Sequence, residues 1–127
     1  MNDYSSILIE IKKMLGLMAD DDSFDTDVIV HINSAFSRLN QLGVGPEDRF
    51  RITGPDETWN DFWGDKTQLP EIKDFIYLQT KILFDAPTGS VLGTYETQIQ
   101  KLEWLLNAAV DPTDDEKEHM ALKPLWG

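Results

Sequence analysis

The spacing of the apolar residues is the strongest constraint on the fold, because these residues recur every three or four positions along most of the chain. Such spacing places them on one face of an α-helix, whereas a half-buried strand requires alternation. Four segments show the helical spacing, and no segment shows sustained alternation. The 127-residue chain is therefore predicted to be all-α, a small bundle of four main helices. The four segments are residues 5–18, 26–42, 70–84 and 90–109.

The first two helical segments are expected to be joined by an acidic turn. Residues 20–27 are rich in aspartate, which favours the first turn of a helix because the helix dipole is positive there. In the first segment Glu10, Lys12 and Lys13 are expected to point outward. The residues expected to point inward are Ile7, Leu8, Ile11, Met14, Leu15 and Met18 in the first segment, and Val28, Ile29, Ile32, Ala35, Phe36, Leu39 and Leu42 in the second.

The last two segments predict an antiparallel helical hairpin. Pro70 suits the first turn of a helix, and residues 85–89 contain the Pro and Gly of a turn. Residues 70–84 are apolar nearly all round, with one face that includes Leu83, which indicates a central helix. Residues 90–109 carry a single apolar seam, made of Leu92, Tyr95, Ile99, Leu102 and Leu106.

A long connection, residues 43–68, separates the two pairs of segments. A structureless loop of this length is uncommon in a compact domain unless it has a function. Trp59, Phe62 and Trp63 stand at i, i+3 and i+4, which indicates a short helix within the connection. Two interpretations of these aromatic side chains stay open: they form a core for the connection, or they form a patch that contacts a partner.

Catalytic and metal-binding patterns are not found. The alternation of Asp21, Ser23, Asp25 and Asp27 resembles a calcium loop, but Thr26 and Ile32 stand where such a loop needs Gly and Glu. Helix capping explains this stretch better. His31 and His119 are too far apart in the sequence to make a paired-ligand motif, and the chain has no cysteine. We therefore expect no catalytic residue, no cofactor and no metal.

The charge balance limits the partners. The chain has 11 basic and 23 acidic residues, a net charge of −12. Phosphate contacts need a cationic surface, so this balance argues against specific DNA binding and against anionic membranes. No apolar run approaches the ~20 residues that a membrane-spanning helix needs.

Residues 1–110 are expected to form the helical domain and residues 111–127 a tail that is acidic first and apolar at its end. We expect this tail to be loosely ordered in the free subunit and to become fixed on assembly. Trp104 lies opposite the apolar seam, beside Thr97, Gln100 and Lys101, and either covers another part of the fold or contacts another subunit. The candidate interface residues are Trp59, Phe62, Trp63, Trp104, Leu122, Leu125 and Trp126.

Three groups of segments together resemble one protein family, the head–tail connector proteins of tailed bacteriophages and prophages, also called head-completion or adaptor proteins. The resemblance extends over residues 5–108 and depends on the order and spacing of the segments. The first is Ile11–Gly16; the second is Phe24–Asp27 with Ile32–Ser34 and Leu39–Pro46; the third is Lys81–Thr88 with Leu102–Asn107.

This resemblance implies a structural virion protein of the phage neck. Such a subunit forms a ring, typically twelve-fold, beneath the portal protein, extends the DNA channel and offers a platform for a stopper or tail-completion protein. It implies assembly in the host cytoplasm, and DNA that passes without specific binding. An acidic channel wall would repel phosphate. The alternative is an acidic phage-encoded inhibitor that mimics DNA, which would need carboxylates at phosphate-like spacing on one face.

Overall fold

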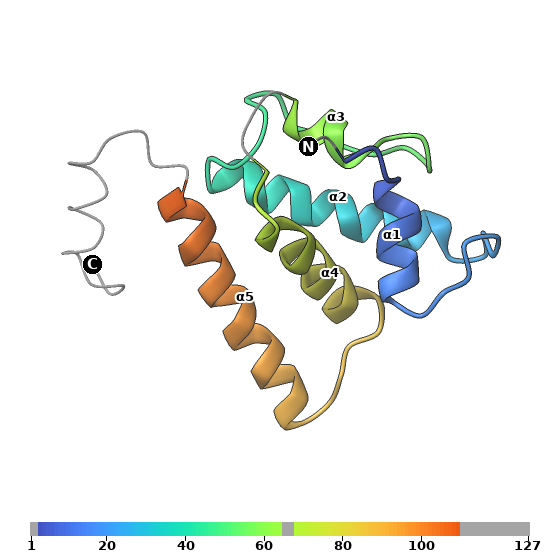
Figure 1. Ribbon diagram of the computed structural model, residues 1–127. Coiled ribbons are helices and arrows are strands. Elements are labelled where there is room, and N and C mark those ends of the chain that lie inside the picture. The colour runs from blue at the N-terminus through green and yellow to red at the C-terminus, as the bar shows by residue number, and fades with distance from the viewer. Residues whose placement is uncertain (1–2, 65–67, 110–127) are drawn as a thin grey trace.

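The computed structural model describes residues 3–64 and 68–109 and shows a helical protein (Figure 1). Within these ranges, extended pairing is limited to one isolated bridge between Ser6 and Thr58. The prediction of an all-α fold is confirmed. The helices are α1 (Ile7–Met14), α2 (Asp25–Gln41), α3 (Trp59–Trp63), α4 (Glu71–Phe84) and α5 (Ser90–Ala109).

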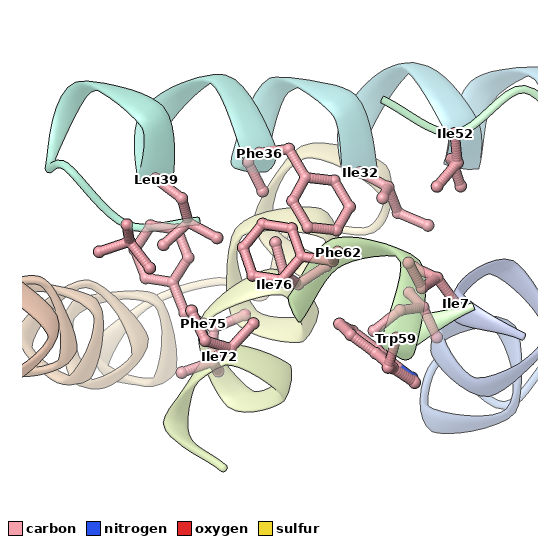
Figure 2. Close-up of a cluster of buried hydrophobic side chains, with 14 of the residues drawn as sticks. Ile7, Ile32, Phe36, Leu39, Ile52, Trp59, Phe62, Ile72, Phe75 and Ile76 are labelled. Carbon is pink, nitrogen blue, oxygen red and sulfur yellow. The ribbon is translucent and has the colours of Figure 1, made fainter. Parts of the chain in front are cut away.

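Helix α4 lies at the centre of the subunit, with α2 packed on one side and α5 on another, while α1 contacts both α2 and α4 (Figure 1). Its apolar circumference is explained by this position, since a helix covered on several sides has little polar surface. Figure 2 shows side chains of α2 and α4 meeting around the ring of Phe62. The buried residues labelled there are Ile7, Ile32, Phe36, Leu39, Ile52, Trp59, Phe62, Ile72, Phe75 and Ile76.

Three of the four long helices agree with the predicted bounds within one residue, but α1 is shorter than expected. It ends at Met14, and Gly16 then adopts a positive φ of 85°, a conformation that glycine tolerates well. The chain therefore leaves the helical path before Met18. Met14 and Met18, both expected to point inward, are exposed. Leu83, near the end of α4, is also exposed, contrary to the prediction.

Lys12 corrects the predicted outer face of α1, because its side chain is buried, with 1% of the residue exposed. Its Nζ lies 2.8 Å from Oδ1 of Asp25 and donates to the carbonyl oxygens of Asp21 at 2.6 Å and Ala19 at 3.3 Å. A buried ammonium group needs such partners to offset its desolvation. The acidic turn between α1 and α2 is therefore folded around a lysine side chain.

The long connection is attached to α2 by asparagine side chains. Asn33 donates to the carbonyl of Ile52 at 2.9 Å and accepts from its N–H at 2.8 Å, as a neighbouring strand would. Asn40 donates to the carbonyls of Pro46 and Glu47 at 3.4 and 3.3 Å. These bonds satisfy backbone groups that the connection cannot pair by itself. The described part of the connection, residues 43–64, is consequently an ordered part of the subunit.

The N-terminal segment is held against α4 by a small charged cluster. Lys73 Nζ lies 2.6 Å from Oδ2 of Asp3 and 3.1 Å from Oε1 of Glu10. Burial works against the charge of Lys73, but the hydrogen bonds to the two carboxylates outweigh it and raise the pKa of this lysine. The hydrogen bond from Lys73 lowers the pKa of Asp3. This cluster joins the segment before α1 to the central helix.

Candidate assembly surface

The three aromatic residues of the connection lie in the core. Thr58 and Asp61 begin α3 with a reciprocal capping box, with bonds of 3.2 and 2.8 Å. This short helix turns Trp59, Phe62 and Trp63 inward, where all are buried. They form the core of the connection, the first of the two interpretations that the sequence left open. In this conformation they present almost no surface to a partner, so the structure does not support a patch there.

Contacts around the buried rings show how these side chains connect the helices of the subunit. The indole Nε1 of Trp59 donates to Oε2 of Glu10 at 2.7 Å, so the polar atom of this buried ring is satisfied. The ring of Phe62 lies 5.0 Å from that of Phe36 and 5.4 Å from that of Phe50, measured between centroids. The aromatic side chains therefore join α3 to α1 and α2.

Trp104 is the sequence-predicted interface residue that the structure places on the surface, with 42% of the residue exposed. It lies beside Leu105, which is also exposed. The two residues border an open hollow of about 450 Å³. We name this surface the α5 outer face; its residues are Thr97, Gln100, Lys101, Trp104 and Leu105.

The helical spacing had placed Thr97, Gln100 and Lys101 beside Trp104, and the structure brings these residues together around one hollow. Sequence reasoning missed Leu105. This residue lies between the inner seam and the outer face, so its helical position favours neither side. Only the absence of a covering helix in the described part of the chain leaves it exposed.

Helix α5 is held in place from one side. The helix packs on α4, and its buried residues are Ile99 and Leu106. Glu103 receives two hydrogen bonds from Arg38 of α2, at 2.8 and 3.1 Å, and these bonds raise the pKa of the arginine. Asn107 donates to the carbonyl of Leu42 at 2.9 Å. The C-terminal half of α5 is thereby fixed in direction, while its outer face stays open.

In the part of the chain that the structure describes, no metal-binding group of side chains competes with this surface. Across residues 3–64 and 68–109, His, Cys, Asp and Glu side chains form no group of three or more that could hold a metal ion. In the same part of the chain, no helix has both the length and the apolarity to cross a membrane. The remaining interface candidates, Leu122, Leu125 and Trp126, lie outside the described residues, and their role stays a prediction.

A small all-α subunit with an apolar surface on one outer helix is typical of a protein that acts by contacting other proteins. The family model described as "Phage connector protein" matches residues 7–113, which include every helix in the described part of the chain. The chain therefore belongs to the phage connector protein family, and the resemblance found in the sequence is confirmed. No curated protein and no solved structure matches the chain.

Family membership gives the general role. Phage connector proteins are structural rather than catalytic, and they belong to the neck of the virion, where they contact other head and tail proteins. The open α5 outer face agrees with a role that depends on protein contacts.

Proposed function

We propose that this protein forms a ring beneath the portal protein, extends the DNA channel and provides the platform on which a stopper or tail-completion protein docks. The family match over residues 7–113 carries this proposal. The α5 outer face supports it, because exposed Trp and Leu side chains around a hollow are typical of protein contacts.

The charge of the protein supports a channel role. With a net charge of −12 repeated in every copy, a ring would be strongly negative, and we expect acidic side chains along its lumen. DNA phosphates would be repelled from such a wall, which allows the duplex to pass without being retained. A cationic wall of the same shape would bind DNA and slow its passage.

We expect twelve copies in the virion, with each copy contacting its two neighbours, the portal above and the stopper below. Assembly would take place in the host cytoplasm before the neck becomes part of the virion. The tail, residues 111–127, is expected to become fixed in this assembly, on the portal or on a neighbouring subunit.

The test is to mix the purified protein with portal rings of the same phage and to examine the mixture by negative-stain electron microscopy and native mass spectrometry. A second ring stacked on the portal axis, with a mass of twelve added subunits, is the expected result. Portal rings of an unrelated phage serve as the control. A protein that binds no portal and instead binds a basic DNA-processing enzyme as a monomer or dimer would identify the alternative, an inhibitor that mimics DNA.

A further inference from the structure

A closed ring places a requirement on each subunit. Every contact joins one side of a copy to the opposite side of its neighbour, so each copy needs two different faces that fit each other. In a twelve-fold ring, neighbouring copies are rotated by roughly 30°, so the two faces must lie on nearly opposite sides of the subunit. The α5 outer face is one apolar face, and its counterpart should lie across the subunit from α5.

Helix α1 lies in that position. It contacts α4 and α2, whereas α5 packs on α4, so the two helices flank the central helix on different sides (Figure 1). Ile9 and Met14 of α1 are exposed apolar residues and border a second open hollow of about 510 Å³. We name this surface the α1 outer face; its residues are Ser5, Ser6, Ile9, Glu10, Lys13 and Met14.

The two faces are similar in apolar content and differ in charge: the α5 outer face carries Lys101, and the α1 outer face carries Glu10 and Lys13. Each combines two apolar side chains with hydroxyl-bearing and charged neighbours, and the flexible side chain of Met14 can adapt to a hollow. Lys13 is exposed on the α1 outer face, and Glu96 is exposed one turn before Gln100 at the border of the α5 outer face. Opposite charges at these positions favour this pairing over two copies of the same face.

The N-terminal half of α5 leaves room for a neighbour. A side chain at Gly93 would meet no atom within 4 Å, which shows that this part of the helix is open. Thr97 follows one turn later on the same side and is small and exposed. Small residues allow a second helix to approach closely, while Trp104 and Leu105 at the other end supply the apolar area.

From these observations we propose that the α5 outer face of one copy binds the α1 outer face of the next, with Trp104 and Leu105 against Ile9 and Met14. The occupant of the hollow on α5 is thus a second copy of this chain. This inference rests on the proposed ring, and it adds the identity of the two faces that close it.

Disulfide cross-linking tests the pairing, because the natural chain has no cysteine. The variants are Lys13→Cys, Gln100→Cys and the double variant, each oxidised alone and on portal rings. The double variant is expected to form a ladder of linked multimers, and each single variant to stay unlinked. Dimers of the Gln100→Cys variant alone would show that two α5 faces meet and would overturn the proposal.

The same experiment separates this inference from the function on which it rests. Rings of the double variant on the portal that stay unlinked would overturn the pairing of α1 with α5 and leave the proposed ring intact. Absence of any ring on the portal, for the natural chain as well, would overturn both.

A matched pair of leucines provides a second measurement. Leu105 and Leu83 are exposed to 47% and 49%, but only Leu105 belongs to the α5 outer face. We expect Leu105→Ala to weaken self-association about tenfold, measured by sedimentation, and Leu83→Ala to leave it unchanged. Equal effects of the two substitutions would contradict the proposal. Thermal melting of both variants checks that each is folded.

Discussion

Trp59 and Trp104 show how differently two parts of this chain use the same residue type. Trp59 begins α3 and is 0% exposed, enclosed by α1 and the rest of the core, whereas Trp104 on α5 is 42% exposed. Both stand in amphipathic helices. The difference lies in the face that each residue occupies. Trp59 lies on the buried face of α3, whose Asp61 is exposed, while Trp104 lies on an exposed face of α5, which packs on α4. Large aromatic residues therefore stabilise the subunit in one region and remain available for contacts in the other.

The largest expected effect is the loss of Trp59. Replacing Trp59 by Ala removes a fully buried ring and leaves the Glu10 carboxylate without its indole partner, so the free energy of unfolding should fall by about 3–5 kcal/mol. Urea denaturation followed by circular dichroism measures the change. Trp104→Ala is the matched control, with an expected change of less than about 1 kcal/mol. Similar losses for the two variants would contradict the distinction between core and outer face.

The contrast between covered and open positions extends to two neighbouring lysines. Lys12→Met should lower the stability by about 2–3 kcal/mol, because it leaves the Asp25 carboxylate without its ion-pair partner and the carbonyl of Asp21 without its buried donor. Lys13→Met, one position along the same helix, changes an exposed side chain and should have little effect. Thermal melting of the two variants gives the comparison. Equal melting temperatures would show that the buried ammonium group is not needed.

The attachment of α5 is expected to be weaker than the core. Arg38 and Glu103 are bridged by two hydrogen bonds, but the arginine side chain is partly exposed, so the pair should contribute about 1 kcal/mol. A double-mutant cycle with Arg38→Ala and Glu103→Ala measures the coupling. Hydrogen exchange should show faster opening of the C-terminal half of α5 in these variants and unchanged protection of α4. Equal loss of protection in both helices would mean that α5 and the core unfold as one unit.

The smallest expected effect concerns pH. The pKa of Asp3 is lowered from 3.8, so its interaction with Lys73 stabilises the protein above pH 3.8 and is lost as the pH falls through the lower value in the folded state. The Asp3→Asn variant should therefore show a smaller decrease in melting temperature between pH 5 and pH 2 than the natural chain. An unchanged pH profile would show that Asp3 does not stabilise the N-terminal segment.

The helices could largely be predicted from apolar periodicity, because burial against one neighbour leaves a clear pattern in the sequence. The residues around Trp104 followed from the same pattern. The family resemblance did not come from apolar periodicity; it depended on the order and spacing of particular segments such as Ile11–Gly16 and Lys81–Thr88. The sequence could not decide whether Trp59, Phe62 and Trp63 form a core or a patch that contacts a partner. Spacing shows that side chains share a face, but it does not show what that face contacts.

Lys12 was placed incorrectly for a different reason. Helical spacing assigns a residue to a side by its angle and its polarity, and a lysine at a border position is assigned to solvent. It does not account for a long side chain whose amine reaches carbonyl oxygens of the following turn. Similarly, Met18 is exposed because α1 ends early, near Gly16. Apolar periodicity defines the last residue of a helix only imprecisely.

The lysine in the acidic turn has a consequence for the conditions that the protein tolerates. A calcium loop loses its ion when the medium is dilute or contains a chelator, because binding follows mass action. Here the positive charge is covalently tethered to α1, so its effective concentration at the turn does not depend on the medium. The turn between α1 and α2 should keep its shape in the presence of chelators and across wide changes in divalent-ion concentration, inside a cell or outside it.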